Sequence, residues 1–196
     1  MDLQISGFLL CVLFTAGHSL SCYQCTSLSA SCPQATCTSG LNSCYSATVI
    51  DGNSTTVKVK SCAISLGCPS GSANLGIGRV SSYCCSTDLC NAQDAPDPSN
   101  NTSTGRSCYY CDGQSCSNTV SCSENENRCI KATGSFGGQS LVVKGCVSKS
   151  ICDAAFSIAG LGGVSCCEGN LCNGAQSVTQ SFLFLFCSLL SFILLH

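Results

Sequence analysis

The sequence has few charged residues and almost no histidine. These shortages argue against nucleic-acid binding and against catalysis by a histidine general base. Only 9% of its residues are charged, the formal net charge is −2, and the eight lysine and arginine residues are scattered singly. Because nucleic-acid binding needs a basic cluster, nucleic acid is not an expected partner. The two histidines, His18 and His196, lie in terminal segments that we expect to be removed. The mature protein would then lack the commonest general base.

Sequence motifs of enzymes are missing as well. The chain has no G-x-S-x-G nucleophile motif and no phosphate-binding loop. Residues 76–81 partly match a dinucleotide fingerprint, but the final glycine and the helix that should follow it are absent. We therefore expect no enzymatic activity, no catalytic residues and no cofactor.

Cysteine, by contrast, is abundant and its spacing repeats. The endings Cys84-Cys85-Ser86-Thr87-Asp88-Leu89-Cys90-Asn91 and Cys166-Cys167-Glu168-Gly169-Asn170-Leu171-Cys172-Asn173 each close a set of ten cysteines. The first set is Cys22, Cys25, Cys32, Cys37, Cys44, Cys62, Cys68, Cys84, Cys85 and Cys90; the second is Cys108, Cys111, Cys116, Cys122, Cys129, Cys146, Cys152, Cys166, Cys167 and Cys172. The chain therefore contains an internal repeat of two modules.

An even number of cysteines in small modules indicates disulfide bonds and an oxidising compartment. A module of about 70 residues buries little apolar surface, and each bridge contributes roughly 2–4 kcal/mol. Zinc is the main alternative, but zinc sites usually mix cysteine with histidine, and adjacent cysteines fit a tetrahedral site poorly. We therefore expect no metal.

Residues 1–19 have the features of a secretory signal peptide. An apolar run from Ile5 to Ala16 is followed by small residues, and we place the cleavage after Ser19. The alternative is a retained signal anchor, for which the run is short.

The first module, residues 20–91, contains a predicted β-hairpin. Residues 46–50 and 56–60 are β-type runs on either side of a turn at residues 51–54. Lys58 and Lys60 alternate with valines and are expected on a solvated face. The second module, residues 108–173, repeats the hairpin with runs 129–133 and 140–144 around a glycine-rich tip. Neither module shows a convincing helical period.

Residues 92–107, between the modules, are predicted to be a linker because they lack cysteine and large apolar residues. N-glycosylation sequons occur at Asn53, on the first hairpin tip, and at Asn100 and Asn101 in the linker. We expect crowding to allow one glycan at the adjacent pair.

Residues 174–196 are predicted to be a glycosylphosphatidylinositol attachment propeptide. Small residues and a short polar spacer precede an apolar run from Phe182 to Leu195 that has no basic flank. A spanning helix needs about 20 apolar residues, whereas a short terminal run after a spacer is typical of a lipid-anchor signal. We expect attachment at Asn173, with Gly174 as the alternative, and location on the outer leaflet of the cell membrane.

Both modules resemble the lymphocyte-antigen and urokinase-receptor family of three-finger domains. The resemblance rests on the opening Cys-x-x-Cys, the ten-cysteine spacing and the ending Cys-Cys-x-x-[Asp/Asn]-x-Cys-Asn. It implies an all-β, small, disulfide-rich protein with two tandem three-finger, snake-toxin-like domains. It also implies that the side chains of Asn91 and Asn173 close each disulfide palm by hydrogen bonds to backbone near the start of the module.

The resemblance further implies how the cysteines pair, which spacing alone leaves open. The implied bridges of the first module are Cys22–Cys44, Cys25–Cys32, Cys37–Cys62, Cys68–Cys84 and Cys85–Cys90. Those of the second are Cys108–Cys129, Cys111–Cys116, Cys122–Cys146, Cys152–Cys166 and Cys167–Cys172.

Two functions fit such a chain. The first is a lipid-anchored cell-surface protein that binds an extracellular protein through its loop tips, where binding residues concentrate on rigid scaffolds. The alternative is a phospholipase inhibitor of the gamma class, against which the lipid-anchor signal argues. We predict the contact surface in the second module, where Phe136 at the hairpin tip and Phe156, Ile158 and Leu161 in the third loop would form an apolar patch.

Overall fold

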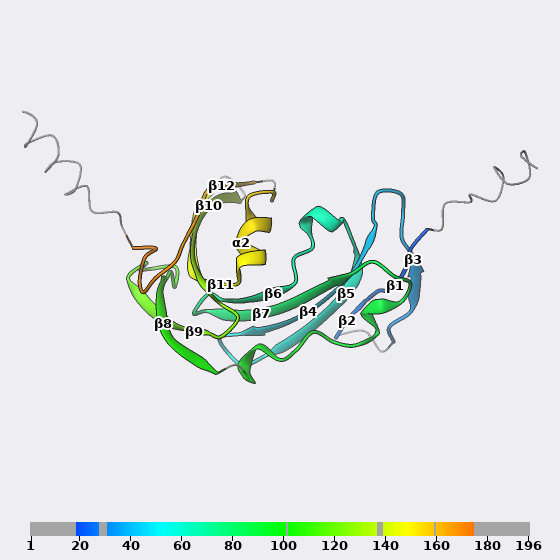
Figure 1. Ribbon diagram of the computed structural model, residues 1–196, viewed down its shortest axis with the longest axis horizontal. Helices are drawn as coiled ribbons and strands as arrows, with labels where there is room; N and C mark the ends of the chain where they lie inside the picture. The colour runs from blue at the N-terminus through cyan, green and yellow to red at the C-terminus, as the bar shows by residue number, and fades with distance from the viewer. Residues whose placement is uncertain (1–18, 28–30, 101, 137–138, 159, 175–196) are drawn as a thin grey trace, which may run out of the picture.

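The structure is a computed structural model that describes residues 19–27, 31–100, 102–136, 139–158 and 160–174, most of them in strands (Figure 1). The strands of the first half are β1 (Ser21–Tyr23), β2 (Cys25–Thr26), β3 (Gln34–Thr36), β4 (Ser43–Asp51), β5 (Thr56–Ala63), β6 (Gly71–Asn74) and β7 (Gly78–Cys85). Those of the second half are β8 (Ser103–Tyr110), β9 (Asn118–Ser123), β10 (Arg128–Phe136), β11 (Gln139–Val147) and β12 (Leu161–Cys167). The helices are η1 (Ser65–Gly67), η2 (Cys90–Ala92), η3 (Pro98–Asn100) and α2 (Lys149–Ala155).

Eight of these strands form one antiparallel sheet that crosses both modules. Their order is β12-β10-β11-β6-β7-β4-β5-β2, while β1 pairs with β3 and β8 pairs with β9 in separate sheets. Figure 1 shows α2 and η1 on one side of the long sheet, with β8, β9 and the chain between the modules on the other. We call these sides the α2 face and the strap face.

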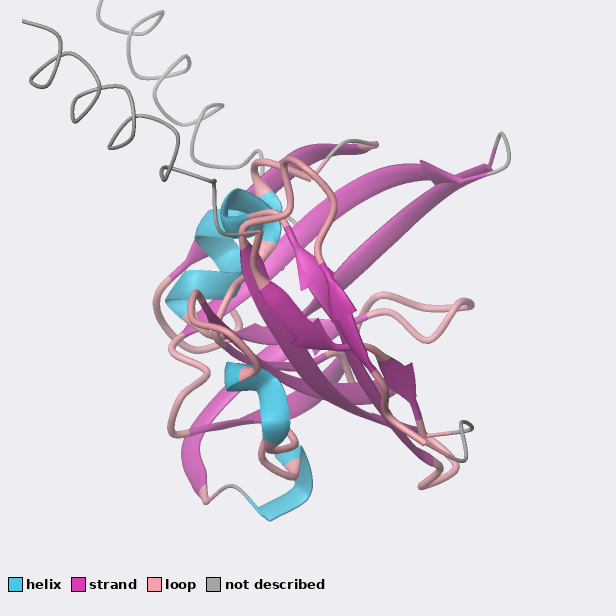
Figure 2. Cartoon of the chain, turned by 90° about the vertical axis from the view of Figure 1, so that its right-hand side faces the viewer, coloured by secondary structure: helices cyan, strands magenta, loops and turns pink. Residues whose placement is uncertain are grey.

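The hairpins predicted from the sequence are present in both modules. In the first, β4 pairs with β5 from Ser43↔Ala63 to Ile50↔Thr56. Its turn is ordered by the carboxylate of Asp51, which accepts hydrogen bonds from the backbone N–H groups of Asn53 (2.9 Å) and Thr55 (2.7 Å). In the second, β10 and β11 pair as far as Phe136↔Gln139, and Figure 2 shows this hairpin extending to one side.

The second module contains an α-helix, α2, although its sequence shows no convincing helical period. The helix contains Cys152, whereas the equivalent Cys68 of the first module lies between η1 and β6. Ser148 caps the helix, since its side chain accepts from the N–H of Ile151, and the Cys152–Cys166 disulfide ties it to β12. A helix of seven residues makes about two turns, which is too short to show a 3.6-residue period in the sequence.

The ten disulfides of the structure join the same pairs as the family resemblance implies. They are Cys22–Cys44, Cys25–Cys32, Cys37–Cys62, Cys68–Cys84, Cys85–Cys90, Cys108–Cys129, Cys111–Cys116, Cys122–Cys146, Cys152–Cys166 and Cys167–Cys172. Half-cystines form the buried centre of each palm, where an ordinary domain would have aliphatic side chains. Disulfides thus replace a large hydrophobic core.

The two modules are joined by backbone pairing between β6 and β11. Cys146 pairs with Asn74 and Val147 with Ala73, and the N–H of Ser148 donates to the carbonyl of Ser72 (2.9 Å). A mixed apolar cluster lies on the α2 face of this junction. Its buried members are Ala73 from the first module and Ile130, Val147, Cys152 and Ala155 from the second.

The chain between the modules lies against the first module. We call residues 93–98 the strap. Its backbone is held by hydroxyl groups of β4 and β7: Thr48 donates to the carbonyl of Ala95 (2.7 Å), Tyr83 donates to that of Gln93 (2.7 Å), and Ser81 donates to that of Pro96. The last residues of the predicted linker already belong to β8, which begins at Ser103.

The strap corrects the prediction of a solvated face for Lys60, whereas Lys58 is exposed as predicted. Asp94 of the strap forms ion pairs with Lys58 (2.9 Å) and with Lys60 (3.0 Å), and the Lys60 side chain is mostly buried. The hydrogen bond from Lys58, followed by that from Lys60, lowers the pKa of Asp94. The two lysines therefore hold the strap in place.

Candidate protein-binding surface

Large apolar side chains are exposed at several places on the described part of the chain. In the first module they are Val49, Ile64, Leu66 and Ile77; in the second they are Leu141, Phe156 and Ile158. Single exposed apolar residues are normal on a protein surface, whereas a contiguous group marks an interaction site.

The strand register places Leu141 and Leu161 on either side of one glycine. Gly134 of β10 pairs with Leu141 of β11 and with Leu161 of β12. Directly paired residues in a sheet face the same side, so both leucines share a face across a position without a side chain. A Cβ atom on Gly134 would lie 3.2 Å from Cδ2 of Leu161. The leucine side chain thus extends over the glycine.

The end of α2 and the turn after it carry two more exposed apolar side chains, Phe156 and Ile158, and this turn is bonded to the start of β12. Ile158 follows the helix with its N–H bonded to the carbonyl of Ala155 (3.3 Å), and its own carbonyl accepts from the N–H of Leu161 (3.2 Å). Phe156, at the C-cap of α2, is 61% exposed. We call Leu141, Phe156, Ile158 and Leu161 the tip patch.

Three of the four residues that the sequence suggested for binding lie between the end of α2 and the start of β12. Phe156, Ile158 and Leu161 belong to the tip patch. The fourth, Phe136, ends β10 opposite Gln139, but its side chain lies outside the part of the chain that the structure describes. Sequence reasoning missed Leu141, although its alternation with Val143 in the β-type run 140–144 was a signal for a shared face.

The hairpin tip of the first module carries a sequon, although Ile77 of the neighbouring turn is also exposed there. Asn53 is exposed next to the turn that Asp51 orders, so the sequon is accessible there. Of the other two sequon residues, Asn100 ends η3, and Asn101 lies outside the described residues. A glycan on Asn53 would cover the first tip and leave the tip patch open.

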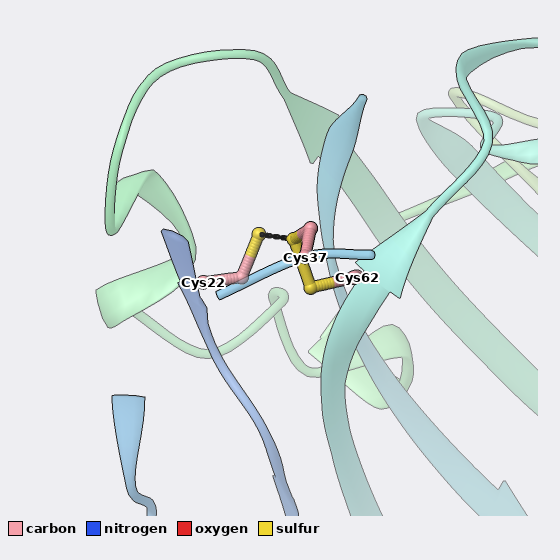
Figure 3. A group of neighbouring side chains, drawn as sticks. All are labelled: Cys22, Cys37 and Cys62. Atoms are coloured by element: carbon pink, nitrogen blue, oxygen red, sulfur yellow. Dashed lines mark hydrogen bonds between the residues drawn. A yellow bond between two sulfur atoms is a disulfide. The ribbon is translucent and has the colours of Figure 1, made fainter. Parts of the chain in front are cut away.

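Two groups of three cysteine sulfurs have the closeness expected of metal ligands. They are Cys22, Cys37 and Cys62 in the first palm and Cys108, Cys122 and Cys146 in the second. Figure 3 shows the first group, in which the sulfurs of Cys22 and Cys37 lie 3.3 Å apart. All six sulfurs are in disulfides, and a metal needs a thiolate. Their closeness reflects stacked disulfides.

The closing asparagines have the role that the resemblance implies. Asn173 is 4% exposed; its side-chain oxygen accepts from the N–H of Tyr109 (2.9 Å), and its amide donates to the carbonyls of Tyr109 (2.9 Å) and Ile130 (2.8 Å). Asn91 makes the equivalent bonds to Tyr23 and Tyr45 in the first module. Each asparagine joins the opening strand of its module to the central hairpin.

The terminal segments with targeting signals, residues 1–18 and 175–196, lie outside the described residues. Among the helices that are described, none has the length and apolarity to cross a membrane.

Two disulfide palms, each carrying three loops, define a tandem three-finger protein. Residues 18–93 match the family model of the u-PAR/Ly-6 domain, and residues 107–173 match that of snake toxins and toxin-like proteins. The chain belongs to the u-PAR/Ly-6 family of three-finger proteins.

Three relatives place the chain within this family. It is 30% identical to the rat (Rattus norvegicus) urokinase plasminogen activator surface receptor over 90% of this chain and 62% of the receptor. The mouse (Mus musculus) receptor is 29% identical over 82% of this chain and 56% of the receptor. The short neurotoxin 3FTx-Oxy4 of Oxyuranus microlepidotus is 38% identical over 41% of this chain and 83% of the toxin. The chain thus spans about three fifths of the length of the receptors it matches.

Proposed function

We propose that this chain is a cell-surface binding protein whose tip patch contacts an extracellular protein. The observation that carries the proposal is the tip patch itself, where apolar side chains gather at the end of loops held by disulfides. Fully burying a large apolar side chain contributes about 1.5–3 kcal/mol. Phe156 is 61% exposed, so a partner that covers it could gain a large part of that value.

The relatives support a role in binding at the cell surface. Two of them are named as surface receptors, and a third is named as a neurotoxin. Because the chain spans about three fifths of the receptors, the ligand in their name is not transferred to it. The partner that we propose is defined by chemistry: an extracellular protein that offers an apolar hollow or ridge to the second module.

We also propose that a glycolipid holds the mature protein on the outer leaflet, attached at Asn173 or at Gly174. The sequence from Gly174 onward supports this proposal, because small residues and a spacer precede an apolar run. The attachment reaction uses the main-chain carboxyl group of the residue. The side-chain amide of Asn173 would remain free to close the palm.

The test is to identify the partner by proximity labelling on live cells and then to measure its affinity for variants. Phe156→Ser and Ile158→Ser are each expected to weaken binding at least about tenfold, which corresponds to 1.4 kcal/mol. The matched control is Leu66→Ser in η1, since Leu66 is 79% exposed but belongs to the first module. It should leave the affinity within about twofold. A tenfold loss in Leu66→Ser with no loss in Phe156→Ser would contradict the proposal and assign the contact to the first module.

A further inference from the structure

Lys144 is a buried lysine for which the described part of the chain supplies no acidic partner. It lies on β11 and is only 8% exposed. No carboxylate of the described residues lies within 4.0 Å of its ammonium group. The ammonium donates one long hydrogen bond, 3.5 Å, to the carbonyl of Cys116, and it lies 5.8 Å from the ring centroid of Tyr109. A buried charge is unfavourable unless an opposite charge compensates it.

This lysine lines a hollow at the base of the second module, where the chain leaves the palm. The hollow has a volume of about 620 Å³ and is lined by Tyr109, Cys116, Ser117, Lys144, Leu171 and Gly174. Gly174 follows the closing Asn173 directly and packs against the ring of Tyr109, since a Cβ atom on it would lie 3.2 Å from Cε2. The opening of the hollow is thus next to the proposed attachment site of the glycolipid.

In the first module, the lysine equivalent to Lys144 has an acidic partner. Lys60 precedes Cys62 by two residues, as Lys144 precedes Cys146, and the two lysines have equivalent places in the hairpins. Lys60 is paired at 3.0 Å with Asp94, which comes three residues after the closing Asn91. The third residue after Asn173 is Gln176, which carries no charge. In the first module, the chain beyond the closing asparagine therefore supplies an anion that the sequence of the second does not encode.

We propose that the hollow binds the phosphate of the glycolipid anchor, with Lys144 as its counter-ion. In such an anchor an ethanolamine phosphate is amide-linked to the carboxyl group of the last residue. The phosphate therefore lies roughly 7 Å beyond that residue, about the span of two extended residues. With attachment at Gly174, which lines the hollow and follows Asn173 as Ala92 follows Asn91, this reach is similar to the separation in sequence between Ala92 and Asp94. The inference therefore requires Gly174, and not Asn173, as the attachment residue. The inference rests on the proposed anchor, and it gives the anchor a docked position on the protein.

The experiment uses full-length protein expressed on cells and released with a phosphatidylinositol-specific phospholipase. Phosphorus NMR then distinguishes the bridging phosphate from the inositol phosphate at the far end of the glycan, which serves as an internal reference. We expect the bridging phosphate to be shifted and immobilised relative to a free phosphodiester. Lys144→Met should abolish both effects, whereas Lys144→Arg should retain them. Lys149→Met, at an exposed lysine of α2, is the matched control and should match the wild type.

A bridging phosphate as mobile as the inositol phosphate in the wild-type protein would overturn the inference, and this measurement does not depend on any variant folding. The inference would also be overturned if the bridging phosphate had the same chemical shift in the wild type and in folded Lys144→Met. If the phospholipase releases no protein and no anchor phosphorus is present, then both the anchor and the inference are wrong. Normal release with a free bridging phosphate would leave the anchor intact and reject the inference alone.

Phosphate from another source is distinguished by two further measurements. A tethered phosphate has an effective concentration in the mM range, so inorganic phosphate at about 0.01 mM, roughly a hundredfold lower, should not displace it. If added phosphate binds in a Lys144-dependent way while the bridging phosphate stays free, the hollow is a site for soluble phosphate and the inference fails. If the protein binds vesicles of phosphatidylserine and phosphatidylcholine in a Lys144-dependent way while the bridging phosphate stays free, the ligand of the hollow is a neighbouring lipid headgroup. The inference then fails.

Discussion

The two modules share one disulfide framework but differ in the third finger. In the first module this finger is the hairpin β6–β7, whereas in the second α2 takes the place of the first strand. The strand β6 offers its edge to β11, and α2 packs above the same junction as part of the mixed apolar cluster. The cysteines fix the palm, and the segments between them are free to diverge. Here the divergence lies where the modules meet.

The modules also differ in the course of the chain beyond the closing asparagine. After Asn91 the strap folds back over a strand face lined with hydroxyl groups, and Thr48 and Ser46 of that face are buried beneath it. After Gly174 the described part of the chain ends beside an open hollow. Small polar residues therefore do not by themselves indicate a free linker, because a complementary polar face can bind their backbone.

The largest expected effect tests what the modules have in common. Asn91→Ala and Asn173→Ala should each lower the free energy of unfolding by about 3 kcal/mol, since each removes three hydrogen bonds of about 1 kcal/mol and leaves their buried partners unsatisfied. Hydrogen exchange should rise in β1 and β4 for the first variant and in β8 and β10 for the second. The measurements are chemical unfolding and exchange on protein released from cells.

The control for this pair is Asn127→Ala, an exposed asparagine, which should change the unfolding free energy by less than about 0.5 kcal/mol. If Asn91→Ala were as harmless as the control, the side-chain bonds would not close the palm. A loss in only one module would show that the two palms are not equivalent.

The next effect concerns the junction between the modules. A Cβ atom on Gly145 would lie 2.4 Å from the carbonyl oxygen of Asn74 and 2.9 Å from Cα of Leu75, both of which are backbone atoms. Gly145→Ala should therefore force β6 and β11 apart and cost about 2 kcal/mol, within the range for overpacking. Hydrogen exchange should increase at Val147 and Ser148 and remain unchanged at the tip of the β4–β5 hairpin.

Gly67→Ala is the matched control, because a Cβ atom there meets no other atom within 4 Å. It should be neutral or slightly stabilising, since alanine restricts the unfolded chain. If Gly145→Ala were as stable as Gly67→Ala, the contact between β6 and β11 would accommodate the added methyl group with no cost in the free energy of unfolding.

The sequence predicted the repeated palms because cysteine spacing is a strong local signal. The β4–β5 hairpin was also predictable, since Asp51 to Ser54 is a turn sequence and valines alternate in the following strand. Phe156, Ile158 and Leu161 were grouped because they lie in one loop of the sequence, and the family resemblance placed that loop beside Phe136, which stays a prediction. Such features depend on residues that are close together or on a known fold.

The features that the sequence did not predict depend on partners that are distant in the chain. The seven residues of α2 show no helical period, and the helix is held by Ser148, by a disulfide and by its contact with β6. The strap has no apolar residue larger than proline, so its sequence does not indicate that it packs against the first module. The pairing of β6 with β11 involves only two residue pairs, for which neither strand has a distinctive pattern.

The smallest expected effect separates the strap from the palm. Asp94→Asn should lower the free energy of unfolding by about 0.5 kcal/mol, because exposed ion pairs contribute little. The hydrogen bonds from Lys58 and then Lys60 lower the pKa of Asp94 below its ordinary value of 3.8. A lowered pKa in the folded state means that the contribution is present above the unfolded pKa and is lost as the pH falls through the folded pKa. The difference between wild type and Asp94→Asn should therefore disappear in acid, as measured by unfolding at neutral and at low pH.

The control is Glu124→Gln, at an exposed carboxylate that forms no ion pair with the described residues. Its free energy of unfolding should equal that of the wild type at either pH. A difference between wild type and Asp94→Asn that persisted below both pKa values would show that the effect of the substitution does not come from the charge of Asp94.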